Sequence, residues 1–95
     1  MAIKIIIKRK VPQGKEEDLV PLLVKLRSLA TAQTGYVSGE TLTNVNDPED
    51  YLVISTWQSV DHWKAWAGSK ERAGIQDKID ALLGQKTEYG VYFYG

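Results

Sequence analysis

The chain has no cysteine, a single histidine, and no apolar run near the roughly 20 residues that a membrane-spanning helix needs. The lack of cysteine excludes disulfides, thiolate nucleophiles, iron–sulfur clusters and cysteine-ligated zinc. The lone histidine, His62, cannot form a multi-histidine metal site, and the sequence holds no HExxH or glycine-rich phosphate-binding motif. We therefore expect no metal or cofactor.

Excess charge of either sign is also missing, because twelve basic and twelve acidic residues cancel. A nucleic-acid partner is not expected, since such binding needs a basic excess. The one basic cluster, Lys8-Arg9-Lys10, is expected to mark the exposed end of a strand. The N-terminal apolar stretch is too short and too interrupted by charge for a signal peptide. We expect a cytoplasmic protein that does not bind membranes.

The length of 95 residues predicts one domain over 1–95, because half of it would be too small for a stable core. Alternation of apolar and polar residues predicts a strand over 2–11, with Ile3, Ile5 and Ile7 on one face. Leucines at helical spacing predict a helix over 15–33, with Pro21 in its first turn and Gly35 after its end.

Two strands, 36–45 and 51–58, are predicted to form an antiparallel hairpin around the turn-forming segment NDPED. That segment lacks the spacing of a calcium loop, so a solvated turn is favoured over a metal site. A second helical region begins at Ser59, is interrupted at Gly68 and Ser69, and ends at Gly84 before a last strand over 86–94. The order β-α-β-β-α-β predicts an α+β fold of the ferredoxin-like type.

Both faces of the predicted strands are apolar, although one layer of helices covers only one face of such a sheet. The last strand places Tyr89, Val91 and Phe93 on one face, and Tyr92 and Tyr94 on the other. An uncovered apolar face of this size needs a partner. We expect a homodimer that pairs sheet against sheet.

Candidate site residues gather in the second helical region. Trp63 and Trp66 are three residues apart and share a helix face, and Arg72 and Gln76 lie on or beside the apolar stripe that follows. One interpretation is a cavity between this helix and the sheet, walled by Trp66 and furnished with Arg72, Gln76 or Asn44. The alternative is that Arg72 extends outward and Gln76 bonds locally. His62 is either a half-exposed surface residue or an acid–base group.

The element order and the run YLVISTWQSVDHWKAWAGSKER resemble the antibiotic biosynthesis monooxygenase (ABM) family, in which a strand ending in Trp precedes Ser and spaced helical aromatics. The resemblance implies a dimeric α/β barrel with one pocket per subunit. Members of the family include cofactor-free oxygenases of polycyclic phenols, quinol monooxygenases and haem-degrading enzymes. The Asn, Trp and His of the haem-degrading branch fall on Ile7, Trp66 and Gln76. Only the tryptophan matches, which disfavours haem degradation.

The resemblance therefore favours a cofactor-independent monooxygenase that oxidises a small aromatic, phenolic or quinol ligand. Trp66, with Trp63, would stack on the ring system, and Arg72 would stabilise a phenolate. His62 or Tyr36 would move the proton. Trp57 and Trp63 are also expected to serve packing, which leaves Trp66 as the main site candidate. Two other hypotheses are a dimer that binds a hydrophobic ligand without turnover, and a haem-binding relative without the usual ligand.

Overall fold

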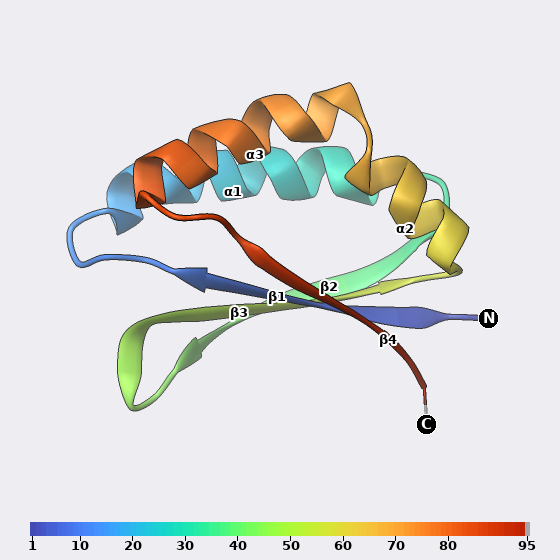
Figure 1. Ribbon diagram of the computed structural model, residues 1–95, viewed down its shortest axis with the longest axis horizontal. Coiled ribbons are helices and arrows are strands. Elements are labelled where there is room, and N and C mark those ends of the chain that lie inside the picture. Colours follow the sequence, from blue (N-terminus) through green and yellow to red (C-terminus); the bar gives the residue numbers. More distant parts are fainter. Residues whose placement is uncertain (95) are drawn as a thin grey trace.

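Seven elements follow one another in the computed structural model, which describes residues 1–94 (Figure 1). They are β1 (Ile3–Lys10), α1 (Glu16–Thr31), β2 (Tyr36–Asn44), β3 (Asp47–Trp57), α2 (Val60–Ala67), α3 (Lys70–Leu83) and β4 (Glu88–Phe93). The strands form one antiparallel sheet in the order β2-β3-β1-β4. The predicted ferredoxin-like α+β fold is confirmed, with the second helical region divided into α2 and α3.

All three helices lie on one face of the sheet, and the opposite face carries no helix (Figure 1). The odd residues of β1 point toward the helices, and Ile3, Ile5 and Ile7 are buried there. β3 and β4 follow the same alternation, because Ile5 pairs with Ser55 on one side and with Val91 on the other. None of the helices within residues 1–94 is long and apolar enough to cross a membrane.

The predicted helix boundaries in the second half of the chain are confirmed by their capping bonds. The Ser59 hydroxyl accepts the His62 backbone N–H at 3.2 Å, which caps α2. The Ser69 hydroxyl accepts the Arg72 backbone N–H at the same distance of 3.2 Å and caps α3. Such caps satisfy N–H groups that have no partner inside the helix. Gly84 ends α3 in the left-handed conformation.

The prediction for Pro21 is wrong. Helix α1 begins at Glu16, so Pro21 lies five positions inside it and not in the first turn. A proline at that point removes one backbone hydrogen bond of the helix. The helix continues through it because its apolar face packs on the core, where Leu19 is fully buried. Packing of an amphipathic face supplies most of the stability of a helix in a protein.

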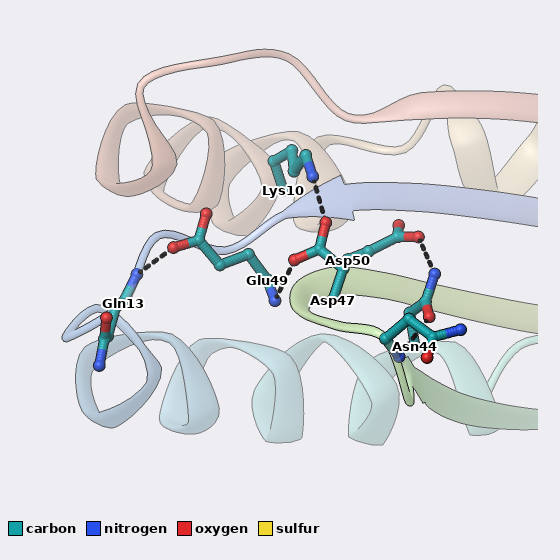
Figure 2. Close-up of polar contacts among 7 residues, drawn as sticks. Lys10, Gln13, Asn44, Asp47, Glu49 and Asp50 are labelled. Carbon is teal, nitrogen blue, oxygen red and sulfur yellow. Dashed lines mark hydrogen bonds and ion pairs between the residues drawn. The ribbon is translucent and has the colours of Figure 1, made fainter.

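The predicted turn of the hairpin is also misplaced. Strand β3 begins at Asp47, so most of NDPED belongs to the strand and the turn occupies residues 45–46. Figure 2 shows why: the Asn44 amide donates to Asp50 at 3.0 Å, and Lys10 forms an ion pair with Asp47 at 2.7 Å. Pairing between β2 and β3 shifts register at Asn44, which leaves Pro48 at an irregularity where no ladder donor is needed.

Candidate functional site

A cavity of about 260 Å³ lies between α1 and the helix-covered face of the sheet. Its helical wall comes from α1 and consists of Val20, Leu23, Val24, Leu26, Arg27 and Ala30. Its floor comes from the strands and consists of Ile7, Arg9, Gly39, Thr41, Val53 and Ser55. The sequence predicted a cavity under the second helical region, so the position of the wall formed by α1 is a correction. α3 packs beside α1 and contributes no lining residue.

One end of the cavity is aromatic, formed by Tyr36, Trp57, Trp63 and Trp66. Trp57 lies at the centre of this group, with ring centroids 5.4 Å from Tyr36, 6.0 Å from Trp63 and 6.5 Å from Trp66. The contacts to Tyr36 and Trp63 are edge-on, and Trp66 stacks at an interplanar angle of 21°. Aromatic surfaces in offset or edge-on contact form a rigid apolar wall.

The three tryptophans do not separate into core and site in the way that the sequence suggested. All are buried, with exposed fractions of 1% for Trp57, 7% for Trp63 and 4% for Trp66. All three also line the cavity. Packing and cavity lining coincide because the buried aromatic cluster of the core forms one end of the cavity. The sequence feature that could have placed Trp57 in the cavity lining is its position at the end of β3, on the same face as Ser55 and Val53.

Tyr36 reaches the cavity from the first residue of β2, and its hydroxyl lies over Gly39. A Cβ atom at Gly39 would stand 2.7 Å from that hydroxyl oxygen. Glycine at this position therefore leaves room for the phenol ring along the floor. Of the three residues proposed from the sequence for catalysis, Tyr36 is the one that lines the cavity.

Arg72 lies on the other side of the aromatic group, between α3 and β4. Its guanidinium donates to the Ala67 carbonyl at 3.2 Å and to the Tyr89 hydroxyl, and its Cζ stands 5.0 Å from the Tyr89 ring centroid. Burial raises the pKa of Tyr89, and the charges of Arg72 and Arg9 oppose that rise. The cavity lining does not include Arg72.

Gln76 is buried as the sequence suggested, but its amide is engaged in a hydrogen-bond network. Its Oε1 accepts from Arg9 Nη2 at 3.2 Å, and its Nε2 donates to Asp80 Oδ1 at 2.9 Å and to Thr87 Oγ1 at 2.8 Å. Gln76 does not line the cavity, and it reaches the cavity only through Arg9.

Arg9 is the site residue that the sequence analysis missed. It was expected at an exposed strand end, yet only 5% of its surface is exposed. The flanking Lys8 and Lys10 are exposed as expected. The alternation that buries Ile3, Ile5 and Ile7 continues to the next odd position, so the sequence pattern could have predicted that Arg9 is buried. Burial lowers the pKa of Arg9, although an arginine keeps its charge in proteins.

His62 and Asn44 lie away from the cavity lining. His62 is half-buried at the start of α2, with Nδ1 2.7 Å from the Ser59 hydroxyl oxygen and its ring packed on Gly35. Asn44 accepts from the Asn46 backbone N–H at 2.8 Å and donates to Asp50, which places it in the hairpin turn (Figure 2). Of the site residues predicted from the sequence, Tyr36, Trp63 and Trp66 therefore line the cavity, whereas Arg72, Gln76, His62 and Asn44 lie elsewhere.

Ligands for a metal or for haem iron do not converge in this structure. Within residues 1–94, no three His, Asp or Glu side chains are grouped closely enough to hold a metal ion. The position that the resemblance assigned to the haem-iron ligand is Gln76, which has no imidazole and whose amide is already hydrogen bonded to Arg9, Asp80 and Thr87. These residues therefore cannot bind haem iron through a histidine, as the haem-degrading branch of the family does.

The fold and the site thus define a small α+β domain that has an apolar cavity with an aromatic end and one buried cation, Arg9. The chain belongs to the antibiotic biosynthesis monooxygenase family, whose model matches residues 2–78.

Solved structures share the whole fold. A conserved protein from Methanosarcina mazei superposes with a TM-score of 0.91 at 18% identity, over 100% of this chain and 94% of that one. SnoaB, a cofactor-independent oxygenase from Streptomyces nogalater, gives a TM-score of 0.86 at 15% identity, over 99% of this chain and 93% of SnoaB. At such identities the likeness establishes the fold alone.

Among curated proteins, SchA of Streptomyces halstedii is 20% identical over 69 residues, which is 73% of this chain and 18% of SchA. A 42.8 kDa protein of the whiE locus of Streptomyces coelicolor is 23% identical over 69 residues, or 73% of this chain and 17% of that protein. The chain thus spans less than a fifth of the length of these two relatives.

Proposed function

We propose that this protein is a cofactor-independent monooxygenase that oxidises a small aromatic phenol or quinol in the cavity between α1 and the sheet. The observation that carries the proposal is the aromatic-walled cavity of about 260 Å³ in a member of the ABM family. A cavity of about 150 Å³ is enough for benzene, and drug-sized ligands occupy about 300–1,000 Å³. The volume therefore suits a ligand of a few fused rings.

The chemistry needs little from the protein because the deprotonated ligand is itself the reductant. An anthrone-type carbon loses a proton to give an electron-rich anion, which passes one electron to O2. The resulting radical and superoxide combine into a peroxide, and loss of water leaves a carbonyl. One oxygen atom enters the product and the other leaves as water. The protein binds the ring system, favours the anion and keeps bulk water out.

Tyr36 and the tryptophans take the roles that their positions allow. Trp57, Trp63 and Trp66 supply flat apolar surface for the rings. Tyr36 carries the one hydroxyl among these aromatic residues and is the proton-transfer group we propose. Roles for Arg72 and His62 would require their side chains to leave Tyr89 and Ser59, respectively.

The test is oxygen-dependent conversion of anthrone to anthraquinone in labelled O2, with mass spectrometry of the product. We expect the protein to accelerate the reaction above its uncatalysed rate and to place one labelled atom in the new carbonyl. Tyr36→Phe, which removes only the hydroxyl, should lower the rate about 10²-fold, the lower end of acid–base contributions. The exposed Tyr94→Phe is the matched control.

Stoichiometric quenching of tryptophan fluorescence by the ligand without oxygen uptake would replace this proposal with a non-catalytic binding protein. A Soret shift on titration with haemin would instead indicate haem binding.

We also propose that the protein acts as a homodimer through the uncovered face of the sheet. On this face β1 and β3 place Ile6 opposite Ile54, because both alternate with the odd residues of β1 and β3 that face the helices. Leu42 and Tyr92 extend the same face and are 43% and 56% exposed. Apolar surface of this extent favours burial against a second copy. Burial of a second sheet would also enlarge the core of a chain of 95 residues.

Ile54→Lys is expected to convert the dimer into a monomer, because a charge at the centre of a sheet-to-sheet contact would be buried without a partner. Val45→Lys is the matched control, since Val45 lies in the hairpin turn and is 95% exposed. Sedimentation velocity over a range of concentrations distinguishes the two states. A wild-type protein that sediments as a monomer at all concentrations would exclude the dimer.

A further inference from the structure

Arg9 places a buried positive charge at the floor of the cavity without a carboxylate to neutralise it. Its exposed fraction is 5%, and it lines the cavity beside Ile7. In the part of the chain that the structure describes, the only ion pair within 4.0 Å joins Lys10 to Asp47. Moving a charge from water into an apolar setting is costly unless it is paired. The free-energy cost of burying the unpaired charge of Arg9 therefore needs a physical explanation.

The side chain is held in place by neutral hydrogen bonds and is not neutralised by them. Gln76 Oε1 accepts from Arg9 Nη2 at 3.2 Å, and the Gln76 amide is oriented by bonds to Asp80 and Thr87. The reverse orientation of that amide would point its NH2 group at a guanidinium that can only donate. Asp80 also accepts from the Thr87 backbone N–H at 3.2 Å. Asp80, the carboxylate of the network, is hydrogen bonded to Gln76 and forms no ion pair with Arg9 within 4.0 Å, although its charge raises the pKa of Arg9 against the larger effect of burial.

One donor of the guanidinium has no partner at all. Arg9 Nε is buried and forms no hydrogen bond. A side chain that served only to tie β1 to α3 would be expected to use its donors fully, because an unsatisfied buried donor costs free energy. A fixed position and a charge without an ion-pair partner at the cavity lining are what a preorganised anion site requires.

The position of Arg9 also sets the shape of the ligand. Ile3 pairs with Trp57 across the sheet, and Arg9 lies six residues further along β1. At about 3.3 Å per residue this places the Cα atoms of Ile3 and Arg9 about 20 Å apart. Because Trp57 and Arg9 line the same cavity, it runs lengthwise along β1 and β3. A ligand whose rings contact Trp57 and whose anionic group reaches Arg9 therefore has to be elongated.

We propose that Arg9 is the specificity-determining residue of the cavity and binds the anionic oxygen of an elongated aromatic ligand, either a phenolate or a carboxylate. This inference rests on the proposed function, since it assumes that the tryptophan-lined end receives the rings. Within that function Arg9 takes the role that the sequence analysis gave to Arg72. It stabilises the deprotonated ligand, and the deprotonated ligand is the species that donates an electron to O2.

The test compares a charged ligand with its neutral equivalent of the same shape. Anthraquinone-2-carboxylate and anthraquinone-2-carboxamide are titrated by calorimetry and by tryptophan quenching. We expect the wild-type protein to bind the carboxylate about 10- to 100-fold more tightly, the range for hydrogen bonds to charged groups. Arg9→Met should abolish that preference and leave the affinity for the carboxamide within about threefold, because methionine keeps an unbranched apolar side chain and removes the charge.

Two further variants separate charge at the site from charge in general. Arg9→Lys should keep part of the preference, since it retains the cation but loses the planar fork. Lys25→Met removes an exposed charge from α1, outside the lining, and should bind like the wild type. For the phenolate, the apparent pKa of bound 2-naphthol, followed by absorbance, should lie below its value in solution for the wild type. It should return toward the solution value in Arg9→Met.

Stability measurements distinguish a binding role from a structural one. Arg9→Met removes the desolvation cost of a buried charge and also leaves the buried Gln76 Oε1 without its donor, so the two effects oppose each other. We therefore expect Arg9→Met to unfold near the denaturant concentration of the wild type, while it loses the preference for the carboxylate. Equal affinity of the wild type for carboxylate and carboxamide would overturn the proposal for Arg9 and leave the aromatic cavity intact.

The remaining outcomes separate this proposal from the oxygenase proposal. Preference for the carboxylate that depends on Arg9, without oxygenation of anthrone, would support the anion site and overturn the oxygenase. If neither ligand binds, both proposals fall.

Discussion

Replacement of Trp57 by alanine is expected to destabilise the domain by about 3–5 kcal/mol, the range for buried Trp or Phe to Ala. Only 1% of Trp57 is exposed, and its ring contacts Tyr36, Trp63 and Trp66. Its Nε1 also donates to the Ser55 hydroxyl at 3.3 Å. Because small domains are stable by about 5–15 kcal/mol, the loss is a large fraction of the total.

Urea unfolding followed by circular dichroism measures this loss without depending on tryptophan fluorescence. Trp57→Phe keeps an aromatic ring and gives up the hydrogen bond and part of the volume, so its cost should fall well below that of alanine. A cost under about 1 kcal/mol for Trp57→Ala would mean that the site collapses freely, because the loss depends on the void that remains. The cavity would then not be held open by the aromatic group.

Gly35→Ala is expected to destabilise the protein by about 2–5 kcal/mol through two separable effects. Gly35 has φ of +90°, and an L side chain in left-handed backbone costs about 1–2 kcal/mol. Its Cβ would also stand 2.2 Å from His62 Cγ and 2.5 Å from His62 Cβ, and overpacking adds about 1–3 kcal/mol. The position is fixed further because the Gly35 carbonyl accepts the Gln58 backbone N–H at 2.8 Å.

Gly14→Ala is the matched control for the backbone effect alone. Gly14 has the same φ of +90°, and nothing lies within 4 Å of a Cβ placed there. The difference between the two costs, measured by denaturant unfolding, isolates the clash with His62. His62→Ala in the Gly35→Ala background should recover part of that difference, because it removes the ring but keeps Cβ. Equal costs for the two glycine substitutions would show that α2 shifts to accept the methyl group.

Gly35 also bears on the assignment of His62. The contact with Gly35 and the bond to Ser59 occupy the ring at the junction of α2 and β2, outside the cavity lining. Nothing in the local sequence distinguishes a histidine that packs on glycine from one that transfers protons. The distinction depends on Gly35, which is remote from His62 in sequence and is brought under it by the antiparallel pairing of β2 with β3.

The order of elements, the helix caps and the alternation of strand faces could all be predicted from the sequence. Each of these features depends on residues a few positions apart, such as Ser59 with His62 or Ile3 with Ile5. The two local errors, at Pro21 and in NDPED, arose where packing and cross-strand bonds outweighed residue preferences. The same alternation also predicts that Arg9 is buried. It was instead expected to be exposed because it lies between two lysines in the basic cluster Lys8-Arg9-Lys10.

The sequence by itself thus determined the order of the strands and helices, the alternation of side chains along β1, and that Trp57 and Trp63 serve packing. Tertiary structure alone decided that α1 and not α3 walls the cavity, and that Arg9 and not Arg72 is the buried cation of its lining. The reason is that a cavity is the space left between elements distant in the chain. The Arg9–Gln76 bond, which fixes the cation, spans 67 positions, and no local pattern encodes a contact of that range.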